Sequence, residues 1–338
     1  MSTLVGLDDR PTLADVATFA GVSLATASRV LTGSARVSEE ARRRVQEAVA
    51  RLGYVRCRAK RLPERSGGSV AAIVTEPSAR FFSDPFFARL LRGASRTLSP
   101  VGYQLAFLAV HDPNEYAAAA RFVSRGGVDG VLLVSSHGSD PLMLALRTAG
   151  LPTVVCGRPL SPCGVPYVDA DNVGGARAAV GHLLACGRRK LATIAGPRDM
   201  AAGIDRLQGF SATLDAAGLE SVVAYGDFSL ASGEHAMTRL LERRPNLDAV
   251  FAASDLMAAG ALRALRRSGR QVPDDIAVIG FDDDPIAQYT QPPLSTIRQS
   301  VEEQGSTMAR HVLALIDKAS TPDPQTALPT SLVRRESA

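Results

Sequence analysis

Five charged or aromatic side chains fall at the ends of predicted strands or in the segments that follow them, and together they could bind a polyhydroxylated ligand. They are Asp84 before PFF, Arg206 in RLQGF, Phe228 in GDFS, Asp255 in AASDLM and Asp282 in GFDDDP. Arginine can bind carboxylates, phosphates or vicinal hydroxyls through two hydrogen bonds, and aspartate accepts hydrogen bonds from hydroxyls. The set predicts a polyol site. Helix capping, an ion pair and core packing are the structural alternatives for Asp255, Arg206 and Phe228.

Enzyme chemistry finds little support in this sequence. It contains no GxxxxGK[ST] phosphate loop, no GxSxG elbow, no HExxH motif and no GxGxxG after a predicted strand. The histidines have no metal-ligand spacing, and the grouped acids of VDAD and GFDDDP are typical of capped helices and solvated loops. We therefore expect no enzyme activity, no metal and no cofactor.

The charge distribution indicates a polyanionic partner for the N-terminal part of the chain. Residues 10–65 carry twelve Lys or Arg against five Asp or Glu, whereas the formal net charge of the whole chain is +4. A basic module of this kind suits nucleic acid, although a solvated basic face would explain the charge equally well. No apolar run is long enough to span a bilayer, and the N-terminus has no signal-peptide pattern. We expect a cytoplasmic protein with no membrane partner.

Three short helices are predicted in the basic module. Thr12 can cap a helix with Asp15 in its first turn, and apolar residues continue that helix at helical spacing. Gly21 ends it, Ser23 starts a second helix, and Ser38 starts a third. Two short helices joined through a glycine are typical of a helix-turn-helix DNA-binding motif.

The segment TLADVATFAGVSLATASRVLTGSARVSEEARRRVQEAVARLGYV resembles the DNA-binding head of the LacI/GalR family of bacterial regulators, and the resemblance extends over essentially the whole chain. In that family the recognition helix opens after a Val-Ser pair, here Val22-Ser23. The resemblance implies DNA contacts by Leu24, Ala25 and Arg29 to bases, by Thr12, Thr26 and Ser28 to phosphates, and by Ser23 and Leu62. Leu24 and Ala25 can read only thymine methyl groups or DNA shape, so Arg29 would make most of the base-specific hydrogen bonds.

The linker at residues 54–68 is basic and departs from the family pattern. The resemblance implies that Leu62 wedges into the minor groove and kinks the DNA. Packing in a dimer interface is the alternative for this leucine. The segment is one residue shorter than in the family, Arg56-Cys57 replaces a Pro-Asn pair, and Pro63 would end a hinge helix early. Formation of that helix is therefore left open.

The rest of the chain alternates short apolar strands with helices, which predicts doubly wound parallel sheets. The expected fold class is α/β: an N-terminal helix-turn-helix head of three helices, then two doubly wound parallel α/β lobes of periplasmic-binding-protein type. Pro- and Gly-rich breaks suggest three crossovers between the lobes. The predicted domains are a head at 1–54, a hinge at 55–68, one lobe at 69–161 plus 290–318, and another at 162–289 plus 319–338.

The resemblance also assigns effector contacts. Arg206 matches an effector-contacting arginine and Asp255 matches an aspartate that bonds ligand hydroxyls. Phe228 stands where an aromatic ring commonly covers a sugar, and Asp84 stands where the family usually has asparagine. Asp282 directly follows a strand, and the carboxyl ends of parallel strands are where such sheets bind ligands.

These inferences predict a sequence-specific transcriptional regulator. We expect a homodimer on a palindromic double-stranded operator, because a two-fold pair of heads matches two-fold DNA. The expected mechanism is a repressor released by a small sugar or sugar derivative bound between the lobes. A protein or small-molecule corepressor is one alternative. A solute-binding protein with no regulatory role is another, which the lack of a signal-peptide pattern disfavours.

Overall fold

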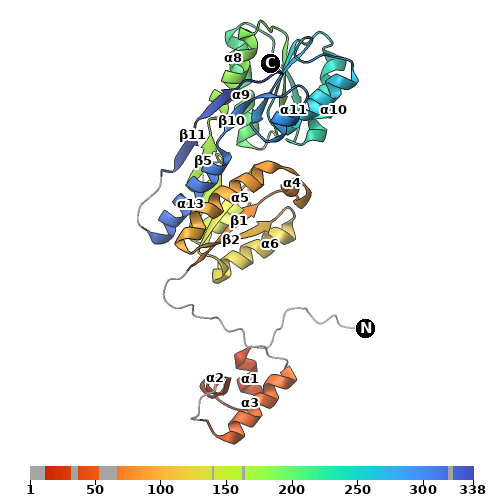
Figure 1. The fold of residues 1–338 in the computed structure, drawn as a ribbon. Helices are drawn as coiled ribbons and strands as arrows, with labels where there is room; N and C mark the ends of the chain where they lie inside the picture. The colour runs from red at the N-terminus through yellow and green to blue at the C-terminus, as the bar shows by residue number, and fades with distance from the viewer. Residues whose placement is uncertain (1–11, 32–36, 53–66, 139–140, 162–163, 319–322) are drawn as a thin grey trace. The chain divides into compact units, whose positions relative to one another are not determined.

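The computed structural model describes residues 12–31, 37–52, 67–138, 141–161, 164–318 and 323–338. The chain divides into two compact units, Met1–Glu64 and Arg65–Ala338 (Figure 1). The division falls inside the predicted hinge, most of which, with Leu62, lies outside the described residues. No helix among the described residues is long and apolar enough to cross a membrane.

The N-terminal unit contains the three predicted helices, α1 (Leu13–Phe19), α2 (Leu24–Leu31) and α3 (Glu39–Leu52). Their apolar faces form one small core that includes Val16, Ala27 and Val45, all with 0% exposure. Gly21 lies between α1 and α2 with φ +60°, a left-handed conformation that glycine adopts without strain. The helix-turn-helix prediction is confirmed.

The C-terminal unit contains two six-stranded sheets. The first, in the N-lobe, has the order β11-β5-β4-β3-β1-β2, and the second, in the C-lobe, has the order β12-β10-β9-β8-β6-β7. N-lobe strands are β1 (Ser69–Val74), β2 (Gln104–Ala109), β3 (Gly130–Val134), β4 (Thr153–Cys156), β5 (Tyr167–Ala170) and β11 (Gln325–Leu328). C-lobe strands are β6 (Leu191–Ala195), β7 (Val222–Tyr225), β8 (Ala249–Ala252), β9 (Ala277–Asp282), β10 (Ser295–Gln299) and β12 (Thr330–Val333). All neighbours pair in parallel except β10 and β12.

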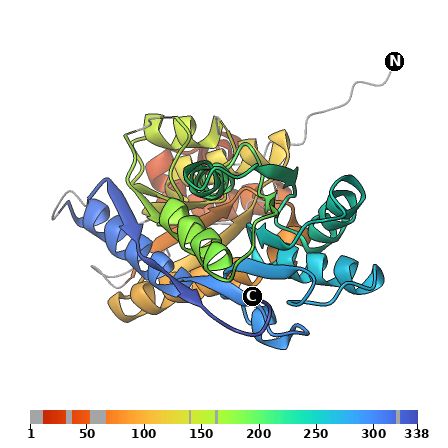
Figure 2. The same ribbon diagram turned by 90° about the horizontal axis from the view of Figure 1, so that it is seen from above.

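Helices cover both faces of each sheet (Figures 1 and 2). The N-lobe helices are α4 (Ser78–Ser83), α5 (Pro85–Leu98), α6 (Pro113–Phe122), α7 (Pro141–Thr148) and α13 (Val301–Asp317), with short helical turns at Ser99–Val101 and Val123–Gly127. The C-lobe helices are α8 (Asn172–Ala185), α9 (Ala201–Ala216), α10 (Leu230–Arg243), α11 (Asp255–Arg267) and α12 (Ile286–Tyr289). Alternate residues of a strand such as β1 enter different apolar cores, which is why its sequence is apolar throughout. The predicted two-lobed α/β fold is confirmed.

The predicted lobe boundaries are wrong at three strands. β5 and β11 pair with each other in the N-lobe sheet, where Figure 1 shows them side by side, whereas β10 pairs with β9 in the C-lobe. The chain therefore crosses between the lobes only after each of these strands, next to Ala170, Gln299 and Leu328. The Pro- and Gly-rich breaks that suggested the crossovers instead precede these strands, because in each case the chain adds one more strand to its sheet before it leaves the lobe.

Candidate functional site

A cavity of about 840 Å³, including the open solvent at its mouth, lies between the two lobes. It is formed where the carboxyl ends of the parallel strands meet the starts of the following helices, the position expected for a ligand site in such sheets. Its lining includes four of the five predicted effector residues, namely Asp84, Arg206, Phe228 and Asp282.

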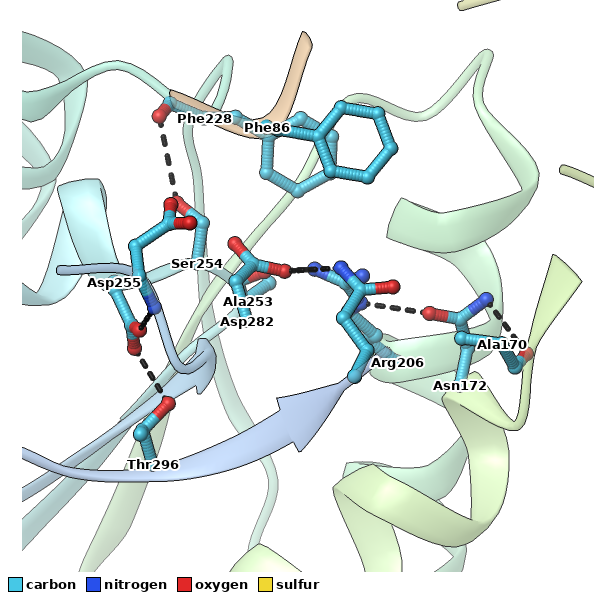
Figure 3. Close-up of polar contacts among 12 residues, drawn as sticks. Phe86, Ala170, Asn172, Arg206, Phe228, Ala253, Ser254, Asp255, Asp282 and Thr296 are labelled. Carbon is cyan, nitrogen blue, oxygen red and sulfur yellow. Dashed lines mark hydrogen bonds and ion pairs between the residues drawn. The ribbon is translucent and has the colours of Figure 1, made fainter. Parts of the chain in front are cut away.

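Arg206 is a buried cation on α9, with 5% exposure. Its Nε donates to Asn172 Oδ1 at 2.9 Å, and one terminal nitrogen donates to the carbonyl of Ala253 at 2.6 Å and to Asp282 Oδ1 at 3.3 Å (Figure 3). The guanidinium also lies 3.7 Å from the centre of the Phe281 ring. These contacts hold the group in one orientation, so it is preorganised rather than flexible.

Asp282 is the last residue of β9, and it lines the cavity beside Arg206. It accepts a second hydrogen bond from Gln299 Nε2 at 2.6 Å. Burial raises the pKa of Asp282 to about 7, while the nearby Arg206 charge lowers it. Its φ of +116° is unfavourable for a side chain with a Cβ.

Backbone strain is concentrated at this cavity. Among the described non-glycine residues, five have positive φ, and three of them, Ser135, Phe228 and Asp282, line the cavity. Residues held in such conformations gather at binding sites, where the surrounding structure imposes them. The Phe228 ring also lies near a cation from the N-lobe, because the Arg80 guanidinium lies 5.6 Å from the centre of that ring.

Asp84 connects the cavity to α5. Its side chain caps that helix by accepting from the amide of Phe86 at 3.0 Å. Burial raises the pKa of Asp84 to about 6, against the lowering effect of this hydrogen bond. The residue therefore has a structural role and also lines the cavity.

Asp255 is not among the residues that line the cavity, which corrects the prediction that it faces the ligand. It is fully buried, accepts from the Thr296 hydroxyl at 2.6 Å and from the amide of Asp284 at 2.8 Å, and points away from Arg206 (Figure 3). Burial, followed by the charge of Asp282, raises the pKa of Asp255 well above its usual range. The preceding residue, Ser254, lines the cavity and caps α11. Adjacent side chains at the start of α11 point in different directions, so Ser254 faces the cavity while its neighbour Asp255 lies in the protein interior.

Sequence reasoning missed several cavity residues. They are contributed by both lobes and include Arg80, Ser135, Arg158, Asp169, Ser254, Gln299 and Gln304. Most lie at or just after the carboxyl end of a strand, so the general rule for parallel sheets could have identified them. Gln304 lies on α13 and carries no such signal, because only tertiary packing brings it to the cavity.

Side-chain contacts join the lobes at the rim of the cavity. Arg158 of the N-lobe donates to Asp205 of the C-lobe at 2.7 Å. His137 Nε2 lies 3.0 Å from Glu76 Oε1 in its own lobe, and His137 Nδ1 lies 3.0 Å from Asp199 Oδ2 in the other lobe. The hydrogen bond to Glu76 raises the pKa of His137. Such contacts break if the lobes separate, so they favour the closed arrangement.

A further pair, Arg89 Nη1 and Asp284 Oδ1 at 2.6 Å, also joins the lobes. Arg89 belongs to α5 and Asp284 follows β9. Asp284 has 1% exposure, whereas Arg89 is half-buried, so it is the carboxylate of this pair that is shielded from water. It adds to the contacts that favour closure.

His111, Asp112 and Glu115 form a small cluster at the start of α6 whose ligand atoms are close enough to hold a metal ion. The Asp112 carboxylate is used as a helix cap, accepting from the amides of Asn114 and Glu115, and the Glu115 hydrogen bond lowers the pKa of Asp112. His111 Nδ1 lies 2.7 Å from Glu115. The cap and the His111–Glu115 contact explain why these three side chains lie together at the start of α6.

The predicted recognition helix is α2. Leu24 is 54% exposed, and Ala25 and Arg29 are also exposed, while Thr26 and Ser28 are half-buried. The side chains required to reach a major groove therefore lie on the accessible side of the helix. Their contacts to bases and phosphates stay predictions.

The two capping residues of the head also lie as the sequence suggested. Ser23 Oγ accepts from the amide of Thr26 at 3.2 Å at the start of α2. Thr12 forms a reciprocal capping box with Asp15, and its hydroxyl lies 2.6 Å from Asp15 Oδ2. A phosphate can only accept, so a Thr12 hydroxyl contact to phosphate would require this hydrogen bond to open.

Comparison with known proteins agrees with both parts of the structure. Residues 12–56 match the model of bacterial regulatory proteins of the lacI family, and residues 180–338 match the periplasmic binding protein-like domain. The HTH-type transcriptional regulator CelR of Thermobifida fusca is 45% identical over 97% of this chain and 98% of its own length. The ribose operon repressor of Halalkalibacterium halodurans is 31% identical over 96% of each chain.

Solved structures give the same result. The complex of the regulator CelR with cellobiose superposes with a TM-score of 0.79, at 45% identity, covering 97% of this chain and all of that one. The Lac repressor dimer bound to operator and the anti-inducer ONPF gives a TM-score of 0.73, at 26% identity, covering 97% and 99%. The chain belongs to the LacI family of bacterial DNA-binding transcriptional regulators.

Proposed function

We propose that this regulator is a repressor that binds a palindromic operator as a homodimer and releases it when a neutral oligosaccharide occupies the cleft. The observation that carries the effector half of this proposal is the buried Arg206, held by Asn172, Ala253 and Asp282 inside a cavity that also contains the Phe228 ring. The complex of the related regulator CelR with cellobiose supports a β-linked disaccharide as the first ligand to test.

The charges around the cavity favour an uncharged ligand. Three arginines line it, and each already has a carboxylate partner: Arg80 with Glu76, Arg158 with Asp205 and Arg206 with Asp282. A phosphorylated sugar or a sugar acid would have to compete with these carboxylates for the guanidinium groups. Hydroxyl groups can instead share the remaining hydrogen-bonding positions without displacing them.

The ligand would act by stabilising the closed arrangement of the lobes. Residues from both lobes line the cavity, and interlobe pairs such as Arg158–Asp205 form when the lobes meet. Ligand and operator must prefer different states by several kcal/mol for regulation to be strong. We propose that the closed, ligand-bound state is the one with low operator affinity.

The head would read DNA through α2, with Arg29 contacting guanine and the other predicted residues contacting phosphates and thymine methyl groups. A homodimer would place two heads in successive major grooves. Largely exposed aromatic side chains on the C-terminal unit, Phe82 at 79% and Tyr289 at 81%, are of the kind that subunit contacts bury. We propose that the protein acts in the cytoplasm, where its operator would be accessible.

Selection of binding sites from a random double-stranded DNA pool, at a stated salt concentration and without sugar, tests the DNA half of this function. The expected product is an enriched palindrome with two half-sites. A panel containing cellobiose, maltose, ribose and their phosphorylated forms is then tested for release. Release by a neutral sugar supports the proposal. Tighter operator binding with sugar would make the ligand a corepressor, and failure to enrich any sequence would contradict operator binding by the free protein.

A further inference from the structure

A directed chain of hydrogen bonds runs along one wall of the cavity. The Arg206 guanidinium donates to Asp282 Oδ1 at 3.3 Å, and Gln299 Nε2 donates to the same oxygen at 2.6 Å. The Oε1 atom of Gln299 then accepts from Gln304 Nε2 at 3.2 Å. The chain thus links α9 and β9 of the C-lobe, through the last residue of β10, to α13 of the N-lobe.

The direction of both amides follows from Asp282. Its Oδ1 atom accepts from Arg206, which can only donate, so this oxygen carries no proton and Gln299 must turn its NH₂ group toward it and its own oxygen toward Gln304. Gln304 must then turn its own NH₂ group toward Gln299. Its oxygen is the end of the chain and is left to accept a hydrogen bond from another group.

No described residue donates to Gln304 Oε1, although the side chain is buried and lines the cavity. A buried amide oxygen without a donor costs about 1–3 kcal/mol of stability, and native proteins rarely leave such atoms unpaired. Because Gln304 is one of the residues that line the ligand cavity, a hydroxyl of a bound ligand could supply the missing donor.

We propose that Gln304 is a specificity-determining residue of the effector site, and that its Oε1 accepts a hydrogen bond from one hydroxyl of the bound sugar. This inference rests on the proposed sugar site. Because α13 packs against α5 in the N-lobe, while Arg206 and Asp282 belong to the C-lobe, one ligand held by Gln304 and Arg206 connects both lobes. Ligand binding at Gln304 thereby favours closure.

This contact selects for a hydrogen-bond donor on the ligand. Gln304 Oε1 cannot donate, so the ligand must present an O–H at this point. Replacing that hydroxyl with fluorine removes the donor and keeps the size nearly unchanged. Replacing any hydroxyl elsewhere on the sugar leaves the Gln304 contact intact.

Calorimetric titration of the full-length protein with cellobiose and its monodeoxyfluoro analogues tests the inference. Gln304→Met preserves the length and shape of the side chain but removes the acceptor. Gln208→Met, at an exposed position on α9, is the matched control. The expected result is about tenfold weaker cellobiose binding by Gln304→Met than by the native protein or the control.

The fluorinated analogues identify the contact directly. One analogue is expected to bind the native protein about tenfold more weakly than cellobiose, and to show no further loss with Gln304→Met. Additive losses for every analogue would overturn the inference. Equal cellobiose affinity for the native and Gln304→Met proteins would overturn it too, while leaving the sugar-binding function intact. If the native protein binds another neutral sugar of the panel and not cellobiose, the same comparison is made with that sugar and its fluorinated analogues. Failure of the native protein to bind any neutral sugar would overturn both.

Thermal unfolding separates this role from a purely structural one. Gln304→Met removes the unpaired Oε1 of Gln304 but deprives Gln299 Oε1 of its donor, so the number of unpaired oxygens along this chain is unchanged. We expect a melting temperature within a few degrees of that of the native protein. A large fall in melting temperature with unchanged sugar affinity would assign Gln304 to folding and overturn the inference.

Discussion

The head and the cleft present their functional side chains in opposite ways. On α2 of the head, Leu24 and Arg29 are exposed on a short helix supported by a small apolar core. In the cleft, Arg206 and Asp282 are at least 93% buried and are held by several hydrogen bonds. DNA is a large polyanion that an exposed helix can reach and long-range charge can attract, whereas a neutral sugar requires desolvated and preorganised partners. The two binding sites therefore have different sensitivities to substitution.

The largest effect is expected from Arg206→Ala. The substitution removes the cation beside Asp282 and four contacts that organise the cavity, so we expect cellobiose affinity to fall by more than about a hundredfold and operator release to be lost. Loss of a buried charge partner also costs stability, about 3–5 kcal/mol. Operator affinity should remain close to native, because α2 is unaltered.

Calorimetry with cellobiose and fluorescence anisotropy with a labelled operator measure the two activities of Arg206→Ala separately. Arg239→Ala, at an exposed position on α10, provides the control for loss of a charge. If the Arg206→Ala protein bound cellobiose and released DNA normally, the assignment of the cleft would be wrong.

Next in size is Arg29→Ala in the head. Loss of a bidentate contact to guanine is expected to weaken operator binding by about 1–3 kcal/mol and to relax base preference at one position in each half-site. Cellobiose affinity should not change. Site selection with the variant measures the preference, with Arg51→Ala on α3 as the control, and an unchanged consensus would rule out base reading by Arg29.

A third test compares Asp282 and Asp255, two aspartates that were both predicted to contact the effector. Asp282→Asn places an NH₂ group among the donors of Arg206 and Gln299, so we expect about tenfold weaker cellobiose binding. Asp255→Asn lies behind the cavity and sets an NH₂ group against the donors Thr296 and Asp284, so it should cost about 1–3 kcal/mol of stability. Its cellobiose affinity should stay within about threefold of native, as measured by calorimetry on the folded protein. A larger loss of affinity for Asp255→Asn than for Asp282→Asn would reverse their assigned positions.

The difference between the two regions also explains what the sequence could predict. The helices of the head follow from local signals, such as the Thr12–Asp15 cap and the Gly21 turn, and the apolar spacing predicts their shared core. The strands of the lobes follow from apolar runs. The cleft depends on tertiary contacts, so residue patterns located its region but could not distinguish Ser254, which lines the cavity, from Asp255, which does not.

The assignment of β10 and β11 to their lobes and the place of Gln304 at the cavity could not be predicted from local sequence signals, because both also depend on tertiary contacts. β10 and β11 are short strands whose pairing partners lie elsewhere in the sequence, and no composition change marks the crossovers. In the sequence Gln304 looks like an ordinary residue of a helix. Only the packing of α13 against the sheet places it beside Gln299. Side-chain chemistry could be read from sequence, but the direction of each side chain could not.

The smallest effect is expected from Asp84→Asn, and it concerns stability. Because the pKa of Asp84 is raised from 3.8 to about 6 by burial, the folded protein holds a proton between these pH values that the unfolded chain has lost. Stability therefore falls as pH rises through this window, and the full cost is present above it. Asparagine keeps the cap on α5 without the buried charge, so we expect about 1 kcal/mol greater stability at pH 7.

Thermal unfolding of Asp84→Asn and native protein across pH 4 to 7 measures this difference. The gain should shrink as the pH falls, because the native carboxyl then becomes protonated as well. The exposed Asp215→Asn on α9 serves as the control. A gain that did not vary with pH would show that burial of the Asp84 charge is not its cause.

The central claim is that sugar in the cleft controls DNA binding by the head. Fluorescence anisotropy of a selected, labelled operator, titrated with cellobiose at fixed salt, tests this claim most directly. We predict that the native protein releases the operator over the concentration range in which calorimetry shows cellobiose binding, and that Arg206→Ala retains the operator throughout. Undiminished operator binding by the native protein at saturating cellobiose would contradict the account.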